Sequence, residues 1–280
     1  MPSHHLNDTD KSSQSIFLHS NDAVVSISDA EKIFYLNEAI VAPSGYRIVI
    51  GLTNLTMPNS MFNVTTNNNI VINGNTWDIP EGNYTAEDLA TAINTATAAS
   101  EDTINCDFDP INNNYTFTFD PAAIINSTTL ERQLGLGRSD NVLQLPTASA
   151  TSYETKNICD LGGTTNIYIR IRNLTMNNID SRGQTTNIIA SIVNNTNFGG
   201  YIFYIPPEVL YYQITEQSIS HLDIELTDQE GRLIELNGAD FNLTITVHYV
   251  KQRESSLKNS LLKQIKDFHN PQIKEEENKK

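Results

Sequence analysis

Histidines are the residues of this sequence best suited to general base catalysis or metal binding, and there are six of them. They are His4, His5, His19, His221, His248 and His269. Apart from the first pair, which lies in a polar stretch, none has metal-ligand spacing to another candidate. His248 falls on the polar face of a predicted strand. We expect a surface or interface histidine there rather than a catalytic base, because a base needs positioned partners.

Acidic residues form two further patterns that could carry chemistry. Residues 107–112, Asp-Phe-Asp-Pro-Ile-Asn, begin like a calcium-binding loop. The loop lacks the sixth-position glycine and the twelfth-position glutamate, so a turn between strands is favoured over calcium. Asp223 and Glu225 share the outward face of one strand, where solvated carboxylates are the usual finding. With no nucleophile elbow, phosphate-binding glycine-rich loop or zinc motif, the sequence predicts no catalytic, metal or cofactor site and no enzyme.

The cysteines and the N-terminal sequence indicate a cellular compartment. Cys106 and Cys159 are too few for a disulfide framework and lack zinc-site spacing, so we expect buried or surface thiols and a reducing environment. The N-terminus shows no basic-then-apolar pattern, and no apolar run approaches about 18 residues. These features predict a protein without a signal peptide or membrane span, soluble and intracellular when made.

An aromatic group surrounds Pro206-Pro207. Its members are Tyr201, Phe203, Tyr204, Tyr211 and Tyr212. Aromatic side chains dominate both protein cores and subunit interfaces, so core packing or subunit contact is the favoured role. Ligand stacking, as on a sugar-binding platform, is the alternative and would need the rings to be exposed.

The elements that must position these residues are mostly strands. Residues 221–249 alternate apolar and polar side chains, with reversals at 228–231 and 237–238, and predict a closing antiparallel unit over a core built earlier in the chain. Similar alternation at 46–52, 165–172, 187–193 and 201–205 brings the total to roughly eight or more strands with short turns. This is typical of a β-sandwich or jelly roll.

A stretch between the early and late strands has a different pattern and is too long for an ordinary loop. Two hairpins are predicted, one across Asn73-Gly74 and one across residues 112–114. A capping box at Thr85 precedes a helix, and Thr128–Leu134 predicts a second short helix ended by Gly135. The order ββαββα indicates a small α+β module.

The sequence therefore predicts an all-β fold, a single jelly-roll β-sandwich with an inserted α+β module. Residues 15–64 and 146–250 form the discontinuous jelly-roll domain, and residues 65–145 form the module. Residues 1–14 are a flexible arm, and 251–280 are a charged tail with a short helix near 257–268.

Charge is distributed unevenly along the chain. The net charge is −15, but residues 251–280 carry eight basic and five acidic residues. The remainder holds 10 basic and 28 acidic residues, a net charge of −18. Such a body repels nucleic acid, so only weak contact through the C-terminal tail is expected. Repulsion between copies should also make assembly depend on salt.

The strand and turn patterns resemble a known family. They are carried by Tyr46–Val64, Ile79–Leu89, Leu134–Gly137 and Leu222–Tyr249. Over most of residues 15–250 the chain resembles the penton or single jelly-roll minor capsid proteins of virophages, polinton-like viruses and related large DNA viruses, Mavirus-type pentons among them.

This resemblance implies a viral structural protein without enzyme activity. It implies a homo-pentamer at the fivefold vertex of an icosahedral capsid, in contact with major capsid protein neighbours. The virion is then its location, after assembly in the host cytoplasm or virus factory. The module would project outward and offer a host receptor contact through residues 65–145. The Arg-Gly-Asp sequence of the similar adenovirus penton bases is absent, and Asp180–Gly183 is the nearest string.

A second hypothesis belongs to another functional class. A carbohydrate- or receptor-binding β-sandwich, such as a virion attachment protein, would also account for the strands and for the richness in Asn and Tyr. Selective glycan binding would separate this hypothesis from a pure scaffold.

Overall fold

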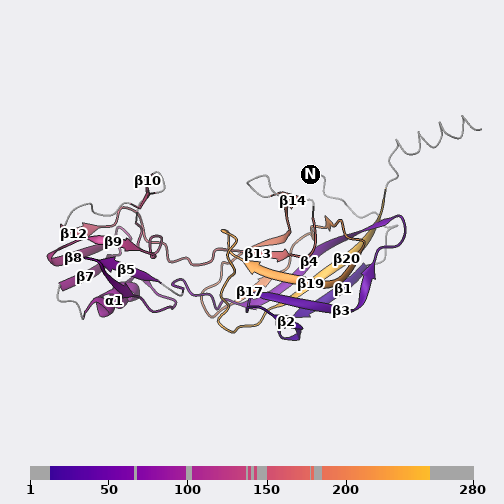
Figure 1. Cartoon of the computed structure of the whole chain (residues 1–280), viewed down its shortest axis with the longest axis horizontal. Helices are drawn as coiled ribbons and strands as arrows, with labels where there is room; N and C mark the ends of the chain where they lie inside the picture. The colour runs from indigo at the N-terminus through magenta and orange to yellow at the C-terminus, as the bar shows by residue number, and fades with distance from the viewer. Residues whose placement is uncertain are drawn as a thin grey trace, which may run out of the picture.

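The computed structural model describes residues 13–65, 68–98, 103–136, 138–139, 142–143, 150–176, 178–179 and 185–252. Within these ranges the regular secondary structure is β-strand apart from one α-helix and one short 3-10 turn, η1 (Ser20–Asp22). The elements gather into two bodies, at opposite ends of an elongated molecule (Figure 1). The prediction of an all-β fold is confirmed.

The larger body is a β-sandwich. Its strands are β1 (Ser13–His19), β2 (Val25–Ser26), β3 (Glu31–Val41), β4 (Tyr46–Pro58), β13 (Asn166–Ile171), β16 (Ile188–Val193), β17 (Tyr201–Tyr204), β18 (Tyr212–Gln213), β19 (Ser218–Thr227) and β20 (Asn242–Lys251). A short hairpin, β14 (Asn178–Ile179) with β15 (Thr185–Thr186), lies in the connection between β13 and β16.

Two antiparallel sheets make up this sandwich. Sheet A has the order β1-β20-β4-β17, with β18 also pairing with β4. Sheet B has the order β16-β13-β19-β3-β2. When the sandwich strands longer than two residues are numbered in chain order, sheet A has the order 1-8-3-6 and sheet B has the order 5-4-7-2. This is the topology of a single jelly roll, as predicted.

Alternating side chains build the core between the two sheets. In β13, Ile167, Ile169 and Ile171 are fully buried while Tyr168 and Arg170 face outward. Burying an aliphatic side chain of this size stabilises the fold by about 1.5–3 kcal/mol relative to leaving it exposed. The same inward pattern in β4, β19 and β20 completes one continuous core.

The last two strands differ from the prediction of one closing antiparallel unit. β19 pairs with β3 and β13 in sheet B, whereas β20 pairs with β1 and β4 in sheet A. The connection between them crosses from one sheet to the other, with positive φ angles at Gly231, Asn237 and Gly238. The predicted turn residues are present, but they turn the chain between sheets and do not close a hairpin.

The smaller body, called the module below, is inserted between β4 and β13. Its elements are β5 (Asn69–Ile72), β6 (Asn75–Asp78), α1 (Ala86–Thr97), β7 (Thr103–Asp109), β8 (Asn114–Ala123), β9 (Ile125–Thr128), β10 (Arg138–Ser139), β11 (Val142–Leu143) and β12 (Ala150–Glu154). Sheets of order β6-β5-β9 and β12-β8-β7 enclose, with α1, a second core that includes Ile70, Leu89, Ile93 and Phe117. The Thr85 hydroxyl caps α1 by accepting from the Asp88 amide, as the capping box predicts.

The predicted helix at Thr128–Leu134 is wrong. Residues 125–128 form β9, in which Thr128 pairs with Ile70, and residues 131–135 form a turn. Strand pairing with β5 outweighs the weak local helical pattern. Gly135 does end this segment, with φ +66°.

Two predicted boundaries differ from the strand pairing. β12 pairs with β8, so residues 150–154, predicted as part of the jelly roll, hydrogen-bond to the module. β1 starts at Ser13, inside the predicted arm, and pairs with β20. The remainder of that arm, the predicted tail helix and Asp180–Gly183 lie outside the described residues. Among the described residues no helix is long and apolar enough to span a bilayer.

Candidate functional site

The outward surface of sheet A carries hydroxyl and amide groups along its centre. Cross-strand pairing places Thr56 beside Asn242, and Asn54 beside Thr244. These side chains point away from the core because Leu55 and Leu243, which alternate with them, are buried. The centre of this surface is therefore polar and uncharged.

Aromatic and aliphatic side chains flank this polar centre. Phe17 of β1, paired with Thr244, is 79% exposed. On the other edge strand, Phe203 is 72% exposed, and its ring stacks on that of Tyr201 with centroids 5.9 Å apart. Ile205 and Leu210 lie in the segment after β17 and are also exposed. We call the outward surface formed by β1, β17, residues 49–58 of β4, residues 242–248 of β20 and residues 205 and 210 the sheet A face.

The segment after β17 crosses the outward side of β4. A Cβ atom on Gly51 would lie 2.6 Å from the Val209 Cγ1 atom, so only glycine allows this approach. Tyr211 lies edge-on to His248, and its hydroxyl is 2.9 Å from the His248 Nε2 atom. Burial lowers the pKa of His248. The histidine expected at a surface or interface is thus half-buried against Tyr211.

The outward surfaces of the two sheets differ in charge. None of residues 13–19, 49–58, 201–204 and 242–248, which line the sheet A face, is Asp, Glu, Lys or Arg. Arg47, Glu208 and Lys251 lie just outside these ranges. The outward side of sheet B instead carries Arg170, Arg172, Glu31, Asp223 and Glu225. Arg172 pairs with Glu31 and lies 3.9 Å from Asp223. Desolvation raises the pKa of Glu225, although Arg172 opposes the shift. Asp223 and Glu225, expected as solvated carboxylates, therefore lie instead in a network of charged side chains around Arg172.

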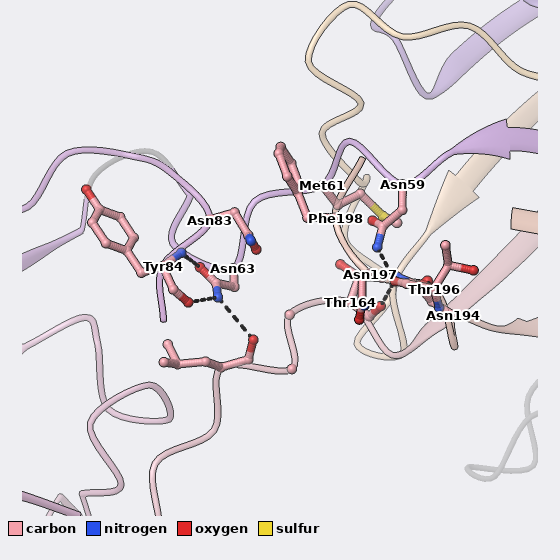
Figure 2. A pocket seen from close by; sticks show the side chains of 13 residues that line it. Asn59, Met61, Asn63, Asn83, Tyr84, Thr164, Asn194, Thr196, Asn197 and Phe198 are labelled. Carbon is pink, nitrogen blue, oxygen red and sulfur yellow. Dashed lines mark hydrogen bonds between the residues drawn. The ribbon is translucent and has the colours of Figure 1, made fainter. Parts of the chain in front are cut away.

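Asn63 ties together the two chain segments that join the sandwich to the module. Its Nδ2 atom donates to the carbonyl oxygens of Tyr84, at 2.8 Å, and Leu161, at 3.1 Å. Its Oδ1 atom accepts from the Tyr84 amide at 2.9 Å. Figure 2 shows these bonds at the module side of the connection. One buried amide thus holds the outgoing and the returning segments at one point.

A cavity of about 400 Å³ lies beside Asn63, between the sandwich and the module. We call it the joint cavity. Asn59, Thr196 and Phe198 line it from the sandwich, and Asn83 and Tyr84 line it from the module (Figure 2). None of its lining residues is Asp, Glu, Lys, Arg or His. It offers hydrogen bonds and aromatic surface but no nucleophile and no acid–base pair.

A second cavity, of about 620 Å³, lies beside the same connection and is charged. On its module side Arg132 pairs with Asp160 at 2.5 Å, and on its sandwich side Arg232 pairs with Asp228 at 2.7 Å. Desolvation raises the pKa of Asp160, but hydrogen bonds from Arg132 and from the Gly162 amide outweigh it and lower the pKa overall. Each arginine of this lining thus pairs with an aspartate of its own body, and Glu131 and Glu235 leave the lining acidic.

The remaining residues considered from the sequence are structural in the described ranges. The His19 Nδ1 atom accepts from the Asn21 amide, and His221 stacks on Tyr35 at 5.5 Å. In the loop considered for calcium, Asp109 accepts hydrogen bonds from Ile111 and Asn112 of its own turn. Among the described residues no group of three or more His, Cys, Asp or Glu could hold a metal ion. His4, His5 and His269 lie outside them.

The two thiols are poor nucleophiles. Cys106 is buried in the module core, and desolvation, reinforced by Asp107, raises its pKa. Desolvation and the neighbouring Asp160 also raise the pKa of Cys159. Both cysteines are free of disulfide bonds.

The aromatic residues around Pro206-Pro207 divide between buried and exposed positions. Tyr204 and Tyr212 pack against the sandwich core, and Tyr201 and Phe203 stay exposed on the sheet A face. Sequence reasoning did not identify this face as a unit. The signal that could have found it is the absence of charged residues from residues 13–19, 49–58, 201–204 and 242–248 of an acidic chain.

Comparison with known proteins finds similarity at the level of structure. No protein-family model matches the chain, and no curated protein matches it. The chain is similar to a penton protein of known structure. The crystal structure of the selenomethionine-labelled mavirus penton protein aligns with a TM-score of 0.45 and 12% identity, over 85% of this chain and all of that one.

Proposed function

We propose that this protein is a structural component of an icosahedral viral capsid, in which five copies form a ring at each vertex, beside major capsid proteins. The observation that carries the proposal is the sheet A face, an exposed and uncharged surface with aromatic edges in a chain of net charge −15. The resemblance in strands and turns points in the same direction. The virion is then the place where the protein acts.

The composition of the sheet A face suits a subunit contact. The buried centre of a protein interface is depleted in charged residues and enriched in aromatic ones. Phe17, Tyr201 and Phe203 lie on this face, and Asn54, Thr56 and Thr244 supply hydrogen-bonding groups between them. Its occupant is a second copy of this chain. A stable contact of this kind buries at least about 1,000 Å² in total.

A ring follows if the sheet A face meets a different surface of the next copy. Such a heterologous contact repeats around a rotation axis and closes without open ends, as cyclic symmetry requires. The charged outward side of sheet B is less suited to form the dry centre of a contact, because desolvating ion pairs is costly. With the sandwich in the ring, the module at the other end of the molecule (Figure 1) is the part proposed to face the host.

The test is the solution mass of purified protein, measured by light scattering. We expect a species near five times the 31.2 kDa chain mass. Tyr201→Ser with Phe203→Ser should reduce it to the monomer, because aromatic hot-spot residues buried in an interface contribute about 2 kcal/mol or more each. Ile111→Ser, which removes an 88% exposed side chain from a module turn, is the matched control and should leave the mass unchanged. An unchanged pentamer in the double variant contradicts the proposal.

A further inference from the structure

We propose that the joint cavity binds a neutral sugar. This site lies apart from the sheet A face, and the proposal does not depend on assembly. Its volume of about 400 Å³ falls at the small end of the range for ligand pockets, roughly 300–1,000 Å³. A ligand there would be no larger than a short oligosaccharide.

The lining of the joint cavity selects against charged ligands. Its polar side chains are amides and hydroxyls, from Asn59, Asn83, Thr164, Thr196 and Asn197 among others, and no formal charge lies in the lining. In a chain of net charge −15 this absence is informative, because an ionic ligand would find no counter-charge there. A polyhydroxylated neutral molecule matches such groups.

One buried acceptor in the cavity lining has no partner. Asn59 is only 6% exposed, and its Nδ2 atom donates to the Thr196 carbonyl oxygen at 2.6 Å. Its Oδ1 atom is buried without a hydrogen-bond donor. Figure 2 shows this amide among the side chains at the sandwich end of the cavity. A carbonyl oxygen only accepts, so the group that satisfies it must donate, as a sugar hydroxyl does. Because this oxygen is covered, the hydroxyl reaches it once the Asn59 amide turns toward the cavity.

Two exposed amides extend the hydrogen-bonding surface to both bodies. Asn197 lies in the loop between β16 and β17, and Asn83 precedes α1 in the module. Each side-chain amide offers both a donor and an acceptor, the combination that pairs with neighbouring sugar hydroxyls. By contrast, both the donor and the acceptor of the Asn63 amide already hydrogen-bond to Tyr84 and Leu161. It supports the site but does not supply a free group.

An aromatic ring forms an apolar side of the joint cavity. The Phe198 ring is 45% exposed and stacks on Phe62 with centroids 5.6 Å apart, which fixes its position. Met61 lies beside it in the cavity lining. The C–H face of a sugar ring is apolar and packs on such a surface. Small ligand sites commonly combine apolar walls with a few placed polar groups in this way.

The experiment uses the full-length protein and a panel of free neutral sugars: D-galactose, D-mannose, N-acetyl-D-glucosamine and lactose. Binding is measured by saturation-transfer NMR and then by calorimetric titration. We expect millimolar or tighter binding of at least one sugar. Asn197→Ala and Asn83→Ala should each weaken it about tenfold, the effect of losing a hydrogen bond worth about 1.4 kcal/mol.

A matched control lies two residues from Asn197. Asn195 is exposed in the same loop but does not line the cavity, so Asn195→Ala should bind as the unmodified protein does. Because these three asparagines are exposed, the variants should fold normally, and circular dichroism checks this. Failure to bind any sugar of the panel overturns the proposal. So does binding that Asn197→Ala and Asn83→Ala leave unchanged, or binding confined to sialylated or sulfated glycans on an array.

Discussion

The surroundings of His248 make the stability of the sandwich sensitive to pH. Its Nε2 atom lies 2.9 Å from the Tyr211 hydroxyl, and burial lowers its pKa from an ordinary value of 6.5. In the pH range between the lowered pKa and 6.5, the unfolded chain therefore binds more protons than the folded one. Above pH 6.5 the His248 ring is neutral in both states and the stability of the fold is at its full value. As the pH falls from 6.5 through the folded-state pKa, this contribution to stability is lost.

Replacing this histidine should remove part of the pH dependence. Between pH 7.5 and about 5, the urea midpoint of the unmodified protein should fall further than that of His248→Gln. Asp160 and Asp240, whose pKa values are lowered, and Glu225, whose pKa is raised, titrate in both proteins. The difference between the two curves therefore reports His248 alone. Parallel curves would show that the histidine is not coupled to folding.

At the scale of elements, the turn after β9 depends on the backbone of Gly135. This residue has φ +66°, and a Cβ atom there would lie 2.2 Å from the Asn157 carbonyl oxygen. Gly135→Ala combines left-handed backbone strain of about 1–2 kcal/mol with overpacking of about 1–3 kcal/mol. The module should lose roughly 2–5 kcal/mol of unfolding free energy, measured by urea titration of Trp77 fluorescence in β6.

The β5–β6 hairpin offers a control for the steric part of this loss. Gly74 has φ +80°, and nothing lies within 4 Å of a Cβ atom built there. Gly74→Ala should therefore lose only the backbone strain of about 1–2 kcal/mol. If the two variants lost the same unfolding free energy, the close approach of residues 157–158 to Gly135 would contribute nothing to the loss.

These elements also show how far the sequence predicts the fold. Alternation identified the long strands, and Asn73-Gly74 and the Thr85 capping box fixed a hairpin and a helix start, because these signals are local. The helix predicted at Thr128–Leu134 failed because its alternative, pairing of Thr128 with Ile70, joins residues far apart in sequence. Alternation likewise cannot assign β19 and β20 to different sheets, since it reports which side of a strand is buried and not the neighbouring strand.

The candidate sites could be predicted less well than the strands. Stretches without charge are visible in the sequence, but the exposure of Phe203 and the path of the segment after β17 across Gly51 are set by the fold. The joint cavity brings together Asn59, Asn83 and Asn197, which only the fold makes neighbours. Common surface residues such as Asn carry no spacing signal of the kind that metal ligands do.

At the scale of the whole molecule, the sheet A face, the proposed contact surface, belongs to a strongly acidic body. Outside residues 251–280 the chain holds 28 acidic and 10 basic residues. Bringing five such bodies together costs electrostatic work, which the proposed contact through Phe17, Tyr201 and Phe203 must outweigh. Repulsion acts over a Debye length of about 30 Å at 0.01 M salt but about 10 Å at 0.1 M. Burial of apolar surface is not weakened over this range of salt concentration.

The sign of the salt dependence therefore tests the nature of the subunit contact. We expect sedimentation velocity to show mostly monomer at 10 mM NaCl and a growing pentamer fraction between 100 and 500 mM, because salt screens the repulsion between bodies and leaves the uncharged contact intact. Tyr201→Ser with Phe203→Ser should stay monomeric throughout. A contact made of ion pairs would show the opposite trend, with pentamers falling apart as salt rises. That outcome would indicate that the interface is the charged outward side of sheet B and not the sheet A face.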